Sequence, residues 1–274
     1  VSTNLHHWAI VQDAKKKGAK VVVIDSYKSR TAKQADWHIQ PKPGSDGALA
    51  MAIINHIIFN DLIDEDYIAN HTNGFDELKN HAVGKDAEWA SKITGINSSD
   101  IQKLAYEIAT NQPVGIRIGV ALERHYGGGQ TIRAVTCIPA LTGSWKHVGG
   151  GITQFPVWEH PYKFDVICRP DLIPKKTRVI NALQIGRALL GENIEKNNPI
   201  MSMMCWNANP VTQAAETEKI IKGLEREDLF LVSAEHFISD TASYADILLP
   251  ATMGAEHEDM ILSWGHLYLT YNEK

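Results

Sequence analysis

The chain has 274 residues, of which 44% are hydrophobic and 22% are charged, and its formal net charge is −5. This composition is ordinary for a globular protein, and the length allows one large α/β domain or two smaller ones. The negative charge gives no attraction to nucleic acid or to an anionic membrane, and no apolar run approaches the roughly 18 residues of a membrane span. We therefore expect neither a nucleic-acid partner nor a membrane span in this chain.

The first part of the chain predicts an α/β unit. A helix is expected before Gly18, and the β-branched run over residues 20–24 is typical of a parallel strand covered on both faces. Ser45 is expected to cap a helix over residues 47–60, whose apolar side chains keep helical spacing. Further helices are predicted over 64–71, 75–83, 98–108 and 131–141, and a strand over 114–119.

A second unit follows a proline-rich stretch. Residues 152–180 contain four prolines and little periodicity, so they are a candidate boundary or an embellished loop. Beyond them we predict helices over 179–190, 213–224 and 240–244, and strands over 199–205, 229–232 and 247–249. This alternation favours Rossmann-like parallel sheets flanked by helices, in two α/β units over residues 1–170 and 171–274. No internal repeat is evident.

The cysteines and the termini limit what the chain can hold. Cys137, Cys168 and Cys205 are far apart, which argues against a disulfide framework and against a zinc or iron–sulfur site within these residues. The chain begins at Val1 without Met and stops at Lys274, so we expect an internal fragment of a longer protein. The run Glu256-His257-Glu258-Asp259 is interpreted as a turn rather than a metal site.

The predicted strand over residues 20–24 ends at Asp25, and Asp46 opens the next helix. A carboxylate at the C-terminal end of a strand can accept hydrogen bonds from ribose hydroxyls or from a base edge. The glycine fingerprint of an NAD-binding Rossmann fold is missing after this strand, which argues against the alternative of an NAD-dependent dehydrogenase. We therefore expect a different dinucleotide.

Four segments in order resemble the molybdopterin oxidoreductase family, also called the dimethyl sulfoxide reductase family. They are residues 18–46 with Pro43-Gly44-Ser45-Asp46, residues 119–143 with Leu122-Glu123-Arg124 and Leu141-Thr142-Gly143, the run Asn207-Ala208-Asn209-Pro210, and residues 241–257 with Tyr244-Ala245-Asp246. In this family two molybdopterin guanine dinucleotides hold one Mo or W atom. The resemblance therefore implies that each α/β unit holds one guanosine end of this cofactor.

The resemblance also implies the binding residues. Asp46 can accept from guanine N1–H and N2–H₂ at once, and residues 26–28 can supply amide groups and a cation near a diphosphate. The expected cofactor-binding residues are Asp25, Ser26, Tyr27, Lys28, Gly44, Ser45, Asp46, Gly119, Leu122, Glu123, Asn207, Asn209 and Glu235.

Structural roles are the alternatives for these residues. They are an Asx turn at Asp25, a helix cap at Asp46, and capping or turn roles for the residues after the strands of the second unit. Glu123 stands where many relatives have Gln, and an anion near a diphosphate is unfavourable unless it is paired. Its alternative partners are Arg124 and a pterin N–H. The glycines at 149–151 either allow a cofactor to approach or form a flexible turn.

The family's Cys cluster and the segment that supplies its metal ligand are absent from this chain, so we expect no catalytic residue and no metal ligand here. An iron–sulfur cluster is expected only in the missing N-terminal part. The run Gly151-Ile152-Thr153-Gln154-Phe155-Pro156 replaces the Arg-Gly-Gln-Asn of formate dehydrogenase-like members, which argues against formate.

For the whole protein we expect a two-electron reaction such as oxygen-atom transfer, with electron-transfer subunits as partners, in the cytoplasm or the periplasm. The chain by itself is expected to have no turnover. The non-enzymatic alternative is an α/β ligand-binding or scaffold module.

Overall fold

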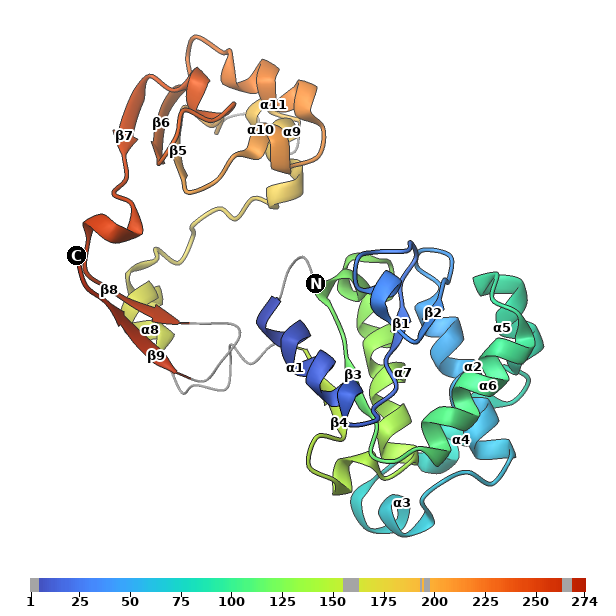
Figure 1. Cartoon of the computed structure of the whole chain (residues 1–274). Coiled ribbons are helices and arrows are strands. Elements are labelled where there is room, and N and C mark those ends of the chain that lie inside the picture. The colour runs from blue at the N-terminus through green and yellow to red at the C-terminus, as the bar shows by residue number, and fades with distance from the viewer. Residues whose placement is uncertain (1–4, 155–162, 193, 195–197, 263–267) are drawn as a thin grey trace. The chain divides into compact units, whose positions relative to one another are not determined.

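A computed structural model describes the chain in several stretches (Figure 1), which are residues 5–154, 163–192, 194, 198–262 and 268–274. The described residues form two compact units: unit 1 holds residues 5–154, and unit 2 holds those from 163 onward. Both units combine parallel strands with helices, so the predicted α/β class is confirmed. Among the described helices, none combines the length and the apolar character that a membrane crossing requires.

Unit 1 contains most of the helices. Its helices are α1 (Leu5–Lys16), α2 (Asp46–Phe59), α3 (Glu65–His71), α4 (Phe75–Ala82), α5 (Ala87–Thr94), α6 (Ser98–Thr110) and α7 (Gly128–Leu141). Three short 3₁₀ helices join these elements: η1 (Ala32–Gln34), η2 (Val120–Arg124) and η3 (Ser144–Lys146).

Helix α2 is the centre of the unit 1 core. Its residues Ile53, Ile54 and Ile57 are at most 2% exposed, and the helix packs against α5, α6 and α7. Such a helix is apolar over most of its circumference because other helices cover it on several sides. The predicted helix over 47–60 is thus confirmed, with a start one residue earlier than expected.

Two pairs of parallel strands complete unit 1. Strand β1 (Val22–Ile24) pairs with β2 (Trp37–Ile39), and β3 (Gly115–Arg117) pairs with β4 (Gly151–Thr153). The sequence predicted β1 and β3 but missed β2 and β4. Each missed strand has only three residues, too few to show the alternation that identifies a strand.

An ion pair joins η3 to the start of α3. The Lys146 ammonium donates to both carboxylate oxygens of Asp64, at 2.8 and 2.7 Å, and Asp64 also accepts the amide N–H of Tyr67. Gly143 is required beside this pair, because a Cβ there would lie 2.2 Å from Asp64 Oδ2. These contacts hold the pKa of Asp64 below its usual range, and the Lys146 ammonium is the main cause.

Unit 2 contains a three-stranded parallel sheet in the order β5 (Ser202–Trp206), β6 (Phe230–Glu235) and β7 (Ile247–Pro250). Leu189, Ile220 and Leu231, each at most 1% exposed, form the centre of its core. An antiparallel hairpin joins β8 (Asp259–Leu262) to β9 (Leu269–Asn272). The helices are α8 (Phe164–Cys168), α9 (Ile185–Leu189), α10 (Pro210–Gln213) and α11 (Thr217–Leu224), with 3₁₀ helices η5 (Pro170–Leu172), η6 (Ala182–Gln184), η7 (Ala242–Tyr244) and η8 (Gly254–Glu256).

A strand–loop–strand module occurs once in each unit, so the expectation of no internal repeat was wrong. Module 1 is residues 21–40 and module 2 is residues 231–250, and equivalent residues differ by 210 in number. In both, a strand is followed by a loop, a 3₁₀ helix and a parallel neighbouring strand, and the equivalent pairs are Val22 with Trp37 and Val232 with Ile247. The repeat was missed because most positions differ. The identical pairs are Val22/Val232, Ser29/Ser239, Thr31/Thr241, Ala32/Ala242, Ala35/Ala245 and Asp36/Asp246.

The shared aspartates and serines make the same hydrogen bonds in both modules. Asp36 Oδ2 accepts the amide N–H of Val21 at 2.8 Å, and Asp246 Oδ2 accepts that of Leu231 at 2.7 Å. In the same way, each module's serine hydroxyl accepts the amide N–H three residues later, at 3.2 and 3.3 Å. A carboxylate thus closes each module by satisfying the amide at the start of the first strand, a group that is costly to leave unpaired.

We expect Asp246→Ala to loosen module 2, because it leaves the Leu231 amide without an acceptor. The measurement is hydrogen exchange, and the Leu231 amide should exchange roughly fivefold faster than in the wild type, since one hydrogen bond contributes about 1 kcal/mol. The control is Glu227→Ala, at an exposed position between α11 and β6. Equal exchange rates in Asp246→Ala and the wild type would contradict the closing role of Asp246.

The stability of unit 1 should fall in acid. The Val21 amide, and after it Lys15, lower the pKa of Asp36 from its ordinary 3.8, and Lys146 lowers that of Asp64. A carboxyl group with a lowered folded-state pKa contributes stability that is present above its ordinary pKa and is lost as the pH falls through the lowered value. Urea unfolding should therefore show a decline below pH 3.8 that is weaker in the double variant Asp36→Asn/Asp64→Asn. An unchanged decline in this variant would refute the assignment.

Candidate functional site

The loop after β1 contains four of the predicted cofactor residues, and side chains after and within β2 hold its backbone. His38 Nε2 lies 3.0 Å from the Asp25 carbonyl oxygen, and Gln40 Nε2 donates to the Ser26 carbonyl oxygen at 2.9 Å. The Asp25 carboxylate accepts the amide N–H of Tyr27 at 3.4 Å, so the Asx turn weighed from the sequence is present. This weak bond uses one oxygen, and none of the described residues hydrogen-bonds to the other, which can therefore face a ligand.

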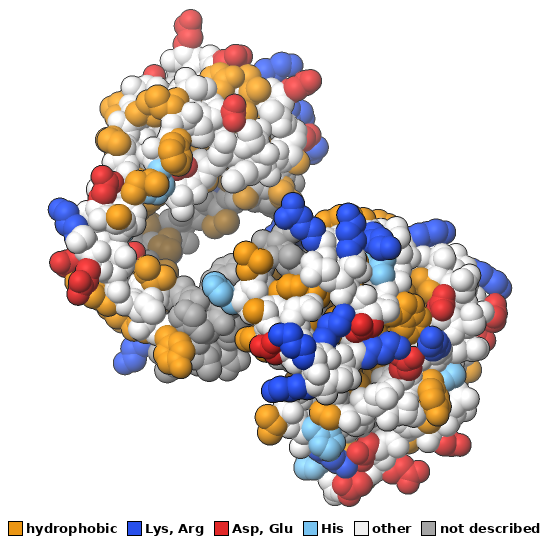
Figure 2. Space-filling view, in the orientation of Figure 1, with side chains coloured by type: hydrophobic (Ala, Val, Ile, Leu, Met, Phe, Trp, Pro, Cys, Tyr) orange, Lys and Arg blue, Asp and Glu red, His pale blue; other side chains and the backbone are white. Residues whose placement is uncertain are grey.

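The same loop is basic and open to solvent. Tyr27 is 66% exposed, and Lys28 and Arg30 are exposed as well. Within the stretches that the structure describes, neither Lys28 nor Arg30 forms an ion pair with a carboxylate. Figure 2 shows Lys and Arg side chains gathered on the face of unit 1 around η1 and β1. The loop can therefore place cations beside an anionic ligand.

The start of α2 differs from the prediction in one respect. The Ser45 side chain does not cap the helix: its hydroxyl donates to the Lys42 carbonyl oxygen at 2.6 Å. The backbone of Ser45 is not extended, and this turns the hydroxyl away from the first helical amides. Asp46 is the first helical residue, where its negative charge favours the positive end of the helix.

The segment between β3 and α7 brings the predicted residues Gly119, Leu122 and Glu123 into one turn around η2. Gln154, at the end of β4, donates a side-chain hydrogen bond to Glu123 Oε1. This oxygen therefore has a partner other than Arg124 or a pterin N–H, the two alternatives that the sequence suggested. The backbone here is tightly packed, since a Cβ on Gly128 would lie 2.4 Å from the Leu122 carbonyl oxygen.

The first turns of α2 and α7 lie against each other. The His125 ring faces Gly44, and a Cβ on Gly44 would lie 3.3 Å from its Nδ1 atom. A Cβ on Gly47 would lie 3.0 Å from Thr131 Oγ1. The structure thus joins Gly44–Asp46 to the turn that holds Glu123, and two helix starts create a region favourable to anions. His125 was not predicted as a site residue, because the sequence around it shows no binding motif beyond the nearby glycines.

Two of the glycines after η3, Gly150 and Gly151, have a third explanation, which the sequence did not reveal. A Cβ on Gly150 would lie 2.1 Å from the Ser144 carbonyl oxygen, and one on Gly151 would lie 2.4 Å from the Trp145 ring. These glycines are therefore needed for close packing of η3 against β4. Neither cofactor approach nor flexibility is required to explain them.

In unit 2 the three predicted residues have different surroundings. Asn209 Oδ1 accepts from both the amide and the hydroxyl of Thr241, at 3.1 and 2.7 Å, so this side chain ties the loop after β5 to module 2. Asn207 is exposed and has a left-handed backbone with φ of 50°. Glu235 is equivalent to Asp25, and its Oε1 accepts the amide N–H of His236 at 2.8 Å. Glu235 and Asn207 thus keep more of their hydrogen-bonding groups free for a ligand than Asn209 does.

Cysteine and histidine side chains have local roles. Burial raises the pKa of the Cys205 thiol, which donates to the Ala208 carbonyl oxygen at 3.0 Å. Glu256 accepts the amide N–H of Met253, and His257 Nε2 lies 3.7 Å from Asp259. The described residues contain no group of three or more metal-binding side chains.

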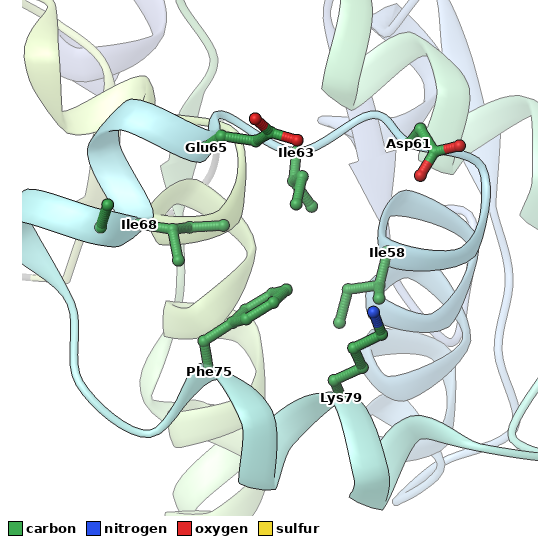
Figure 3. A pocket seen from close by; sticks show the side chains of 8 residues that line it. Ile58, Asp61, Ile63, Glu65, Ile68, Phe75 and Lys79 are labelled. Carbon is green, nitrogen blue, oxygen red and sulfur yellow. The ribbon is translucent and has the colours of Figure 1, made fainter.

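A cavity of about 340 Å³ lies away from these loops, between the end of α2, α3 and α4 (Figure 3). Figure 3 shows Ile63, Ile68 and Phe75 pointing into it, with Lys79 and Glu65 at its sides. It contains none of the predicted cofactor residues, so it is not part of the candidate site.

Both units combine parallel strands with helices, and in each a strand ends at an acidic residue that an exposed loop follows. The chain belongs to the molybdopterin oxidoreductase family, whose model matches residues 3–267. Membership implies a pterin cofactor with Mo or W.

Individual relatives support this membership. Probable oxidoreductase YoaE from Bacillus subtilis (strain 168) is 43% identical over 271 residues, which are 98% of this chain and 39% of that protein. Formate dehydrogenase H from Escherichia coli (strain K12) is 29% identical over 266 residues, which are 90% of this chain and 37% of that protein. The chain thus spans about two-fifths of the length of these relatives.

A solved structure has the same fold. Acetylene hydratase from Pelobacter acetylenicus matches with a TM-score of 0.75 and 21% sequence identity, over 97% of this chain and 41% of that one. At this identity the likeness concerns the fold alone.

Alanine substitutions at two adjacent glycines test the packing at the start of α7. We expect Gly128→Ala to destabilise unit 1 by about 1–3 kcal/mol, because its Cβ would overlap the Leu122 backbone. Gly129→Ala is the matched control, since a Cβ there meets no atom within 4 Å, and it should be neutral or stabilising by up to about 1 kcal/mol. Chemical unfolding measures both variants. Equal effects would show that the turn around Glu123 is not packed as described.

Proposed function

We propose that this chain is the molybdopterin guanine dinucleotide-binding core of a Mo or W oxidoreductase. The repeat of modules 1 and 2 is the observation that carries the proposal. Asp25 and Glu235 stand at equivalent positions, each at the C-terminal end of a parallel strand, where carboxylates accept from ribose hydroxyls. A cofactor with two guanosine ends matches a protein with two such positions.

The residues of unit 1 fit a guanosine diphosphate. Asp25 has an oxygen left for ribose, and Lys28 and Arg30 lie a few residues further along the same open loop. Asp46 offers the paired acceptors that suit the N1–H and N2–H₂ edge of guanine. The amides at the starts of α2 and α7 favour a negative group nearby. The polar and charged groups needed for the base, the ribose and the phosphates are therefore all present in unit 1.

Asn209 has a supporting role in this proposal. Its side-chain oxygen already accepts two hydrogen bonds from Thr241, so it positions the loop after β5 rather than reads a base. In unit 2 the ligand contacts are assigned to Glu235 and Asn207. In unit 1, Ser45 supports the turn before α2 through its bond to Lys42, and Asp46 contacts the ligand.

The chemistry belongs to the whole protein. When bound, the cofactor supplies the metal centre for a two-electron reaction, here proposed to be of the oxygen-atom transfer type, while the chain's residues bind and orient the nucleotide ends. Relatives and structural neighbours are named for formate and for acetylene, so similarity does not select the substrate.

GDP should raise the melting temperature of the chain. A ligand at a hundredfold its dissociation constant stabilises the folded state by about 2.7 kcal/mol, which corresponds to several degrees for a protein of this size. Asp25→Ala should reduce the shift, whereas Asp76→Ala, an exposed acid in the first turn of α4, should leave it unchanged. ADP should give a smaller shift, since adenine lacks the paired donors that match Asp46.

The comparison separates two kinds of failure. Equal shifts with GDP and ADP would remove the guanine assignment, and no shift with either nucleotide would contradict nucleotide binding by this chain.

A further inference from the structure

Modules 1 and 2 share one backbone design, but their loops carry opposite charges. Lys28 in module 1 is equivalent to Ile238 in module 2, and Arg30 is equivalent to Asp240. The loop of module 1 therefore has two cations where the loop of module 2 has an apolar residue and an anion. The loop backbones have the same hydrogen bonds, so these side chains project from equivalent positions.

The cations of module 1 are available to a ligand. Lys28 and Arg30 are exposed and have no carboxylate partner among the residues that the structure describes. Their nearest acid along the chain is Asp25, whose carboxylate instead accepts the Tyr27 amide. A phosphate group beside this loop would gain charge-assisted hydrogen bonds from both side chains.

The loop of module 2 offers the opposite surroundings. Phe237 is 71% exposed and Ile238 is 75% exposed. The Asp240 carboxylate lies 3.5 Å from Asn209 Nδ2, a neutral amide, so its negative charge is not cancelled by a cation there. A phosphate beside Asp240 would be repelled, whereas the planar face of a base or the carbon atoms of a ribose would pack well on Phe237 and Ile238.

We infer that the two modules bind unequal parts of a nucleotide: module 1 binds a nucleoside together with its diphosphate, and module 2 binds the nucleoside alone. This inference rests on the proposed function, because it assumes that both modules receive a guanosine end. Glu235 then contacts the ribose or the base, as Asp25 does in module 1. The diphosphate of the second end receives no cation from the loop of module 2.

This difference has a measurable consequence. Attraction between an exposed cation and a phosphate weakens as salt screens it, whereas apolar packing and carboxylate–hydroxyl hydrogen bonds respond little. In the wild-type chain, one class of GDP site should therefore weaken strongly between about 0.02 M and about 0.5 M NaCl, and a second class should not. Guanosine, which has no phosphate, should bind both classes with little salt dependence.

Exchanging single residues between the modules tests the inference by calorimetric titration with GDP and with guanosine. Lys28→Ile should weaken GDP binding at the salt-sensitive class about tenfold at low salt, the loss expected for one charge-assisted contact, and should leave guanosine binding unchanged. Ile238→Lys should make GDP binding at the second class stronger and salt-sensitive. Each variant places a residue that the equivalent position already holds, so neither should disturb the fold. Lys92→Ile, at an exposed position in α5, is the matched control and should change neither titration.

The outcomes separate this inference from the function on which it rests. Two classes with the same salt dependence, or an unchanged GDP affinity in Lys28→Ile, would overturn the inference while leaving nucleotide binding intact. Absence of binding by both GDP and guanosine to the wild-type chain would overturn the proposed function, and the inference with it.

Discussion

A hydrogen bond between a carboxylate and a backbone amide closes the module on which both units depend. Asp36 and Asp246 each accept the amide N–H at the start of the preceding strand, and this fixes the second strand parallel to the first. Because this hydrogen bond holds the starts of the two strands together, the loop that joins the strands has an equivalent position in both modules. Asp25 and Glu235 then stand at the same edge of their sheets. The candidate nucleotide sites follow from this one interaction, made twice.

A second constraint acts only in unit 1, where α2 and α7 begin side by side. The two helix starts approach closely, and a Cβ on Gly44 or Gly47 would crowd His125 or Thr131. Gly128 likewise lets the start of α7 approach the backbone of Leu122. Close approach of backbones, rather than any single strong bond, places Asp46 and Glu123 in one region. In unit 2 hydrogen bonds from Thr241 to Asn209 hold the loop after β5 against module 2 instead.

The sequence predicted the long periodic elements well and individual side-chain roles less well. Helix α2 and strand β6 were recognised, because apolar spacing over many residues reflects burial directly. Ser45 was wrongly expected to cap α2, since a cap depends on backbone angles that residue type does not determine. The repeat was overlooked because its backbone is maintained by a few polar residues, while the loop residues between them, such as Lys28 and Ile238, differ completely.

By itself the sequence determined the α/β class, the family resemblance and the acids that end the strands, because β-branched runs and residues at strand ends are local properties of the chain. The expectation that the first strand is covered on both faces was wrong, since no residue of β1 is buried and Ile24 is 43% exposed. Only the tertiary structure decided which polar groups remain available to a ligand. Asn209 and Ser45 are occupied by Thr241 and Lys42, whereas Asp25 retains an open oxygen and Lys28 has no acidic partner within the described residues. The physical reason is that each donor or acceptor can serve few partners, and those partners come from distant parts of the sequence that only folding brings together.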